Sequence, residues 1–280
     1  MLQKIINADD FGISPGVNKA IITAFKEGVL NSASLMVNVA YTDEAVRLIK
    51  ENPGLKVGIH LNLTKQKNQK PVATPADIPL LVDENGLLKH GGSGLGLLSL
   101  FKLREFQRQA EIEMRTQIEK VKALGISVAH LDSHRHVHML PALFPVVKKL
   151  QEEYKISRLR VINESFWKTL PATKNWKCFI DGGVIKHCLM KVFYILNRTK
   201  SDTYFYSLIH TTRLFGQNMK KIKVPAKFKA IEIGIHPSII AEDKKVGSEA
   251  FADYLLYSDD RQKEFEALLD KSLVDRITFS

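Results

Sequence analysis

The sequence predicts an α/β fold in which a mostly parallel sheet carries helices on its faces. Apolar segments of strand length alternate with amphipathic segments of helix length through the 280 residues, the order that builds parallel sheets. Polar residues that interrupt the apolar segments fall near the C-terminal ends of those segments. Because no internal repeat or Ser/Pro-rich linker divides the chain, we expect one domain over residues 1–280, either an open doubly wound sheet or a closed barrel.

Strands are predicted where short apolar runs lie between turn-forming residues or predicted helices. The run KIINAD near the N-terminus and the run AIEIGIHPS near the C-terminus are examples. The predicted strands cover residues 4–9, 32–39, 55–64, 126–134, 158–163, 203–209, 230–238 and 276–279.

Helices are predicted where apolar positions recur at three- and four-residue steps and where capping residues mark the ends. Ser14 followed by Pro15 indicates the start of the first helix. In the longest helix the apolar steps run from Phe106 to Leu124, and Gly125 ends it. The predicted helices cover residues 16–28, 42–52, 103–125, 141–154, 185–197 and 260–273.

Two stretches depart from this alternation and are predicted to be variable insertions, near residues 65–100 and 166–223. The first contains HGGSGLG, whose glycines do not follow the G-x-G-x-x-G order and have no strand before them. We therefore expect a flexible loop there rather than a phosphate-binding loop.

Within the second insertion, the segment Lys186–Lys200 is basic and carries an apolar stripe. The stripe consists of Leu189, Val192, Phe193 and Leu196. Such a helix commonly packs its apolar face against a barrel. The alternative is that it covers the substrate cleft and faces a lipid or an anionic carrier.

The net charge of +11 and the isoelectric point near 9.5 call for an anionic partner to be considered. The densest basic run, Lys220–Lys229, contains only one aromatic residue, Phe228. Nucleic-acid-binding segments interleave charge with several aromatic side chains, so we expect no nucleic-acid partner. The charge favours an acidic or membrane-proximal substrate instead.

Cysteine content and hydropathy predict a cytoplasmic protein. Cys178 and Cys188 are too far apart for a C-x-x-C motif, so no disulfide framework or thiolate zinc site is expected. The longest apolar stretch, Cys188–Leu196, is interrupted by Lys191 and is too short to span a bilayer. We expect no secretory signal and no transmembrane segment, and a homodimer is compatible with the sequence.

Carboxylates and imidazoles collect at the C-terminal ends of four predicted strands. Asp9 and Asp10 end the first strand, His60 lies in the third, the run HLDSHRHVH (130–138) ends the fourth, and His236 ends a later one. In parallel α/β folds these ends meet at the edge of the sheet where active sites form. A carboxylate with two imidazoles can form an open metal site suited to catalysis; the alternative is a network of hydrogen-bonded histidines.

The fourth strand contributes several of these groups. His134, His136 and His138 alternate, so in an extended segment they would share one face, and Asp132 is placed to hold a neighbouring imidazole. Adjacent residues of a strand point to opposite faces. Asp9 and Asp10 can therefore serve one site only if the chain turns, and Phe11–Gly12 is expected to provide that turn.

Four segments resemble the YdjC-like carbohydrate deacetylases. They are NADDFG, GIHLNLT, HLDSHRHVHMLP and IGIHPS, and they follow the family order between about residue 5 and residue 238. The resemblance implies a distorted (β/α) barrel akin to the polysaccharide-deacetylase superfamily. It also implies removal of acetyl from an N-acetylated sugar, which the basic charge suggests is anionic or lipid-linked. Residues 166–223 do not match the oligosaccharide-binding regions of the family, which leaves the sugar open.

The same resemblance implies one divalent ion, Mg²⁺ or Zn²⁺, held by Asp10, His60 and His134. It assigns Asp9 as the catalytic base and His236 as the acid. We further expect Asp132 and His138 to contact the substrate or to support the ligands.

Two other functions remain open from the sequence. A hydrolase of another bond, such as a phosphoester, often uses two metals and further carboxylates, whereas the motif strands offer only Asp9, Asp10 and Asp132. A non-catalytic carbohydrate-binding protein on the same fold would be favoured by loss of Asp9 or of a ligand, and none is missing.

Overall fold

The central element of the protein is a curled parallel sheet of six strands in the order β4-β3-β2-β1-β7-β5. The computed structural model describes residues 2–66, 68–169, 179, 182–219, 221–246 and 258–279. The strands of this sheet are β1 (Gln3–Phe11), β2 (Ser32–Leu35), β3 (Lys56–Leu61), β4 (Val128–Ser133), β5 (Thr203–Tyr206) and β7 (Ala230–Ile235). A separate pair is formed by β6 (Ile222–Val224) and β8 (Ile277–Phe279).

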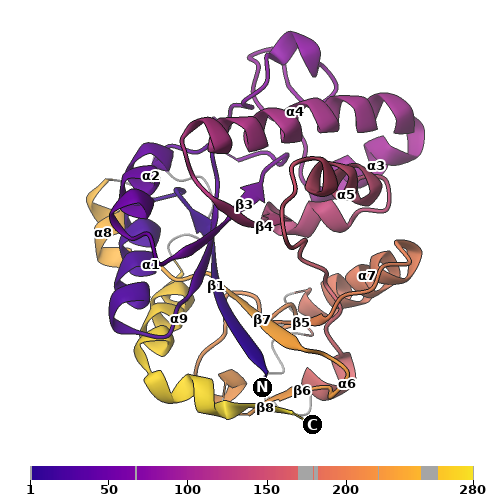
Figure 1. The fold of residues 1–280 in the computed structure, drawn as a ribbon. Coiled ribbons are helices and arrows are strands. Elements are labelled where there is room, and N and C mark those ends of the chain that lie inside the picture. The colour runs from indigo at the N-terminus through magenta and orange to yellow at the C-terminus, as the bar shows by residue number, and fades with distance from the viewer. Residues whose placement is uncertain are drawn as a thin grey trace.

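Helices cover the outside of this sheet, with α1, α2 and α9 on one side and α4 and α5 on another (Figure 1). The α-helices are α1 (Pro15–Glu27), α2 (Thr42–Glu51), α3 (Gly92–Phe101), α4 (Leu103–Ala123), α5 (Phe144–Glu153), α6 (Phe166–Thr169), α7 (Gly183–Leu196), α8 (Ile240–Lys245) and α9 (Asp259–Leu269). Short 3-10 helices are η1 (Pro75–Asp77), η2 (His134–Met139), η5 (Gly216–Met219) and η8 (Lys271–Arg276). Among the described residues, no helix is both long and apolar enough to cross a membrane.

The segment 158–163 bridges the two edge strands of the sheet. On one side Leu159 pairs with Leu131 of β4 in a single parallel bridge. On the other side the Asn163 side chain donates to the Thr203 carbonyl oxygen at 2.9 Å and accepts from the Phe205 N–H at 2.8 Å, both on β5. The curled sheet with this bridge confirms the predicted distorted (β/α) barrel, although 158–163 is not the regular strand that we expected.

Helix α1 illustrates how local sequence sets the elements. The Ser14 hydroxyl accepts a hydrogen bond from the Val17 N–H at 3.1 Å, and Pro15 opens the helix where its missing N–H costs nothing. The helix buries apolar side chains such as Ile21 against the sheet. Burying a side chain of that size contributes about 1.5–3 kcal/mol to folding.

A polar stripe on α4 holds the loop that follows β3. Gln117 donates to the Asn62 carbonyl oxygen at 2.8 Å, and the Glu113 carboxylate accepts from the Val72 and Ala73 N–H groups at 2.8–3.1 Å. Gln109, one turn further on, accepts from the Leu80 N–H at 2.7 Å. The long segment after β3 is thereby fixed to the barrel.

Several predicted elements differ from the structure. The glycine-rich stretch expected as a flexible loop forms α3, which is anchored by the fully buried Leu95, so packing outweighs the low helix propensity of glycine. The helix expected from residue 141 begins at Phe144, and α8 and β6 lie where no element was predicted. Of the predicted insertion 166–223, residues 170–178, 180–181 and 220 lie outside the described residues.

Helix α7 does not pack its apolar face inward. Its buried residues are His187 and Met190, and Phe193 packs against a small core cluster beside β5. Other apolar side chains of the helix are exposed to solvent: Ile185, Leu189, Val192, Ile195 and Leu196. The prediction that this helix packs its apolar face against the barrel is therefore wrong.

Candidate functional site

Asp9 and Asp10 both lie at the C-terminal end of β1, where the strand loses its regular pairing with β2. Asp10 has a φ of 67°, and the Ile13 N–H donates to the Asp10 carbonyl oxygen at 3.0 Å. The chain therefore turns at Asp10, one residue before the expected Phe11–Gly12 turn. The left-handed conformation at Asp10 breaks the strand alternation, so both carboxylates are buried at the same edge.

Asp10, His60 and His134 form one buried group. Each offers a ligand atom, and these atoms lie within 4.8 Å of one another. Asp10 Oδ1 is 2.9 Å from His134 Nδ1 and 3.5 Å from His60 Nε2. The group joins the ends of β1 and β3 with the start of η2, as the positions of these residues in the sequence predicted.

Asp132 orients His60. Asp132 Oδ1 lies 2.7 Å from His60 Nδ1, and the two residues are directly paired between β3 and β4. This contact with Nδ1 holds the His60 ring in one orientation, in which the Nε2 atom faces Asp10. Asp132 thus contacts the His60 nitrogen that faces away from Asp10.

The histidines after β4 do not share one face, as an extended segment would have required. Residues 134–139 form the 3-10 helix η2, and Arg135 and His136 both have φ of 56°. This turn brings His134 to Asp10, whereas the His136 ring lies 5.6 Å from the Phe205 ring. His138 contacts the Ser133 hydroxyl at 2.6 Å and the Arg160 carbonyl oxygen at 3.1 Å.

Arg160 is the main charged group that the sequence analysis missed. Its fully buried guanidinium forms a forked pair with Asp9, with N–O distances of 2.7 and 2.8 Å. It also contacts Asp132 and Glu232, each at 2.7 Å. Its position within the apolar run RLRVIN could have predicted a buried arginine. A buried guanidinium requires acidic partners that are also buried.

Arg261 reaches the site from α9. Its Nη2 atom lies 2.7 Å from Asp10 Oδ2, and the side chain is buried. The Nε and Nη1 atoms of the same guanidinium have no hydrogen-bond partner among the described residues. No pattern in the sequence distinguished this arginine from the solvated charges of its helix.

The carboxylates around His60 favour the cationic form of its imidazole. Asp9, Asp10, Asp132 and Glu232 pair with the guanidinium groups of Arg158, Arg160 and Arg261, and Lys186 interacts electrostatically with Asp9 and Asp10. Burial lowers the pKa of His60, but Asp132 and Asp9 outweigh burial and raise that pKa to about 10. The position between these carboxylates therefore stabilises positive charge.

His236 follows the C-terminal end of β7 and lies near Asp9. His236 Nε2 is 3.8 Å from Asp9 Oδ2, and its backbone N–H donates to the Glu264 carboxylate at 2.7 Å. Burial lowers the pKa of His236 to about 4, although Asp9 and Asp10 act in the opposite direction. The imidazole is therefore neutral at neutral pH, and its Nδ1 atom has no partner among the described residues.

The donor set fits one divalent ion. Two further groups of the described residues have metal-like spacing, Asp9–His60–Asp132 and His130–Asp132–Glu232. Both depend on carboxylates that Arg160 contacts, and it contacts both oxygens of Asp9. Arg261 also pairs with Asp10, but through Oδ2 alone, which leaves Oδ1 facing His60 and His134. Asp10, His60 and His134 are the remaining combination, with one oxygen and two nitrogen donors of the kind that zinc-like ions prefer.

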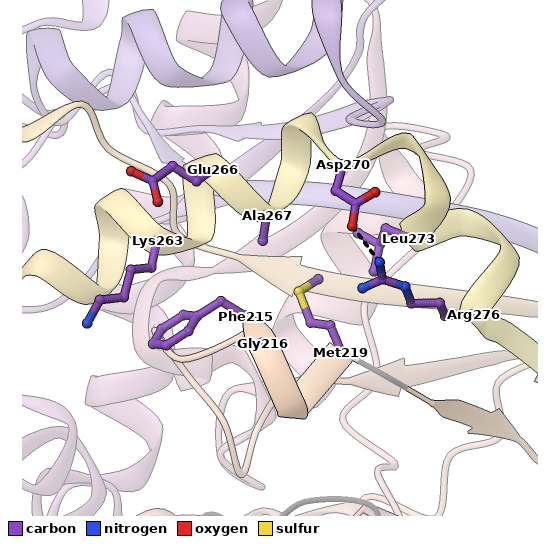
Figure 2. A pocket seen from close by; sticks show the side chains of 9 residues that line it. All are labelled: Phe215, Gly216, Met219, Lys263, Glu266, Ala267, Asp270, Leu273 and Arg276. Carbon is purple, nitrogen blue, oxygen red and sulfur yellow. Dashed lines mark hydrogen bonds and ion pairs between the residues drawn. The ribbon is translucent and has the colours of Figure 1, made fainter.

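A surface hollow of about 360 Å³ lies elsewhere on the molecule, between α9, η8 and the segment 215–219 (Figure 2). Phe215 and Met219 form one wall, and an ion pair between Asp270 and Arg276 closes one end, at 2.5 Å. None of its lining residues belongs to the Asp–His group. The hollow is therefore separate from the Asp–His group at the edge of the sheet.

The family model described as YdjC-like protein matches residues 4–278 of the chain. This chain belongs to the YdjC-like protein family. Carbohydrate deacetylases from Halalkalibacterium halodurans and Clostridium beijerinckii are 30% and 32% identical to it, over 99% of this chain and over 99% and 95% of their own lengths. Identity rises to 43% with a carbohydrate deacetylase from Brevibacillus brevis, but that match spans 55% of this chain and 58% of the relative.

A solved structure supports the family fold. A protein from Enterococcus faecalis V583, named for the proposed cleavage of cellobiose phosphate, matches with a TM-score of 0.64 and 25% identity. The match covers 100% of this chain and 97% of that protein. The described part of this YdjC-like chain therefore shares its fold with that protein.

Proposed function

We propose that this YdjC-like protein is a metal-dependent hydrolase that removes acetyl from an N-acetylated sugar. The observation that carries the proposal is the buried group of Asp10, His60 and His134, with ligand atoms within 4.8 Å of one another. The names of the full-length relatives from H. halodurans and C. beijerinckii support the reaction and the class of substrate.

A single divalent ion held by these three residues would polarise the acetamide carbonyl and make water a better nucleophile. Imidazole nitrogens suit zinc-like ions better than magnesium, which prefers oxygen ligands and retains several waters. The donor set therefore favours Zn²⁺ over Mg²⁺.

We assign Asp9 the role of general base. Burial raises the pKa of Asp9, but Arg160 and His60 outweigh burial and hold it below its ordinary value, so Asp9 is ionised. Arg160 and the Asn7 amide, which donates to Asp9 Oδ1 at 2.8 Å, fix the carboxylate. An ionised, rigid carboxylate can accept a proton from the attacking water.

His236 is placed to protonate the leaving amine, but it starts without the proton. Because its imidazole is neutral at neutral pH, His236 acts as an acid only after receiving a proton. Asp9 Oδ2, 3.8 Å from His236 Nε2, is the nearby group that gains one when water is deprotonated. A proton passed from Asp9 to His236 and then to the amine nitrogen balances the hydrolysis.

Hydrolysis of a phosphoester is the second candidate, and the name of the E. faecalis protein keeps a phosphorylated disaccharide in the test. Two-metal phosphoester chemistry needs a second set of free carboxylates. Here Asp9, Asp132 and Glu232 are paired with Arg160. The pairing favours one ion and an amide substrate.

The test compares Asp9→Asn and Asp10→Asn with Asp43→Asn, which alters an exposed carboxylate on α2. Bound metal is measured by elemental analysis, and acetate and phosphate release are measured on N-acetylated oligosaccharides and a phosphorylated disaccharide. Asp10→Asn should lose metal, and excess metal should partly restore its activity. Asp9→Asn should keep the metal but lose a factor of about 10²–10⁴ in turnover.

Three results would contradict the proposal. Tight metal binding by both His60→Ala and His134→Ala would exclude the ligand set. An Asp9→Asn enzyme that is fast or rescued by metal would indicate that both carboxylates share the ion. Sugar binding without acetate release by the metal-loaded parent would favour a non-catalytic binding protein.

A further inference from the structure

The outer face of α7 is apolar and exposed. Ile185, Leu189, Val192 and Leu196 follow steps of four, three and four residues, so they form one stripe along the helix, and Ile195 lies beside it. Ile185 is 74% exposed and Ile195 is 61% exposed. We call these five residues the α7 face.

The charged side chains of α7 and of the residues that directly follow it are all basic. The segment 183–200 contains Lys186, Lys191, Arg198 and Lys200 and no acidic residue. Lys191, Arg198 and Lys200 are exposed. An apolar stripe flanked by basic side chains is the pattern of helices that lie on the surface of anionic membranes.

A second exposed apolar patch lies on α3 and at the start of α4. It consists of Leu97, Leu100, Phe101 and Leu103, and it is called the α3 face. Leu100 and Phe101 are each 78% exposed, and Lys102 and Arg104 beside them are exposed and basic. The same combination of apolar and basic side chains thus occurs twice.

Both helices flank the chain that leaves the catalytic group. Asn197 at the end of α7 donates to the Met139 carbonyl oxygen at 2.9 Å, and Gly96 of α3 packs beside Leu140. α3 and α7 lie on the same side of the molecule (Figure 1). Met139 ends the η2 turn that begins with His134, so both helices contact the segment that follows this histidine.

We propose that the α7 face and the α3 face form a docking surface for a bilayer that contains anionic lipids. A second copy of this chain is disfavoured as the occupant because it would bring the same basic side chains and another net charge of +11 to the interface. A fluid anionic surface complements the basic residues and accepts two separate apolar patches without a matching shape. The proposal does not depend on the reaction assigned above.

Trp167 provides a local probe for this surface. Its side chain is 81% exposed, and it lines a hollow together with His187, Cys188 and Lys191 of α7. Tryptophan side chains favour the interface between lipid headgroups and hydrocarbon. The chain contains one other tryptophan, Trp176, so a Trp176→Phe background assigns the fluorescence to Trp167.

The experiment measures sedimentation of the full chain with phosphatidylcholine vesicles and with vesicles that also contain phosphatidylglycerol, at low and at high salt. The parent should bind only the anionic vesicles, with a shift of the Trp167 emission to the blue, and high salt should weaken the binding. Lys191→Glu should lower the partition coefficient about fivefold or more. The double substitution Ile195→Ser and Leu196→Ser should lower it about tenfold or more.

Matched controls alter exposed residues away from these helices. Lys56→Glu changes the first residue of β3, and Phe279→Ser changes the last residue of β8. Both variants should bind the vesicles as the parent does. Circular dichroism confirms that each variant is folded, and acetate release from a soluble substrate should be unchanged in the α7 variants. If the parent releases acetate but does not bind anionic vesicles, only the docking proposal fails. If it binds the vesicles but releases no acetate, only the proposed function fails.

Four results would overturn the proposal. They are no binding to anionic vesicles at low salt, equal loss of binding in Lys56→Glu and Lys191→Glu, binding that survives both α7 variants, and a dimer in solution that the Ile195→Ser and Leu196→Ser variant abolishes. The last result would assign the α7 face to a second copy of the chain. Vesicle binding that only the α7 variants lose supports the proposal.

Discussion

Arg160→Met tests whether one guanidinium stabilises the charged interior. The substitution keeps an unbranched, flexible side chain, shorter than that of arginine, but removes the guanidinium and its positive charge. Asp9 would lose a forked pair with N–O distances of 2.7 and 2.8 Å, and Asp132 and Glu232 would each lose a contact of 2.7 Å. All of these groups are buried, so water cannot replace the lost contacts.

The expected loss in the free energy of unfolding is about 3–5 kcal/mol, the range measured when one partner of a buried ion pair is removed. The three contacts do not add, because each carboxylate keeps another partner. Asp9 keeps the Asn7 amide and Asp132 keeps the Ser34 hydroxyl, each at 2.8 Å. Arg160→Lys should lie between the parent and Arg160→Met, because an ammonium retains the charge but not the fork.

Urea denaturation followed by far-UV circular dichroism measures the loss, from the shift in midpoint and the slope of the transition. Arg108→Met is the matched control, since Arg108 pairs with Glu105 on the exposed face of α4 and its removal should leave stability nearly unchanged. If Arg160→Met were no more destabilising than Arg108→Met, the account of Arg160 as the partner of the buried acids would be wrong.

Three further predictions follow from single contacts. Asp132→Asn should weaken metal binding about 10–100-fold because His60 loses its orienting carboxylate; calorimetric titration measures this, and an unchanged affinity would contradict it. Burial raises the pKa of Glu164 from its ordinary value of 4.5 to about 7, so the folded form holds the proton more tightly and stability should fall by up to about 3 kcal/mol as pH rises through that interval. Urea denaturation across the interval should show a smaller slope in Glu164→Gln than in the parent, because burial also raises the pKa of Glu264 to about 7 and that carboxyl keeps its own contribution; equal slopes would contradict the prediction. Gly58→Ala would place a Cβ atom 2.3 Å from the His130 ring and should cost about 1–3 kcal/mol, and an unchanged melting temperature would refute the close packing.

The sequence predicted the location of the site because strand order and strand ends follow simple rules. Apolar runs ending in Asp9–Asp10 and His60 identified parallel strands, and the carboxyl ends of such strands meet at one edge. Asp10, His60 and the run 130–138 could therefore be placed at one edge before any coordinates were known, and the resemblance to the YdjC-like family singled out His134 within that run. The roles of these residues stay predictions until the variants are measured.

The sequence did not reveal the charges that surround the group. Glu232 and Arg160 each interrupt an apolar run, but their pairing joins segments 72 residues apart, and no local pattern encodes such a contact. Arg261 belongs to a helix rich in charged residues, most of which are solvated. The alternation of His134, His136 and His138 gave a wrong prediction because it assumed extended backbone, whereas positive φ angles at Arg135 and His136 turn the chain and separate the rings.

The bridge formed by residues 158–163 has a consequence for truncated or recombined forms of this chain. A fragment ending at residue 157 would contain Asp10, His60 and His134, and so every proposed ligand. It would also contain Asp9 and Asp132 without the guanidinium that neutralises both. During synthesis on the ribosome, Asp9 and Asp132 should therefore stay unpaired until Arg160 emerges, and the barrel can close only after β5 and β7 have followed.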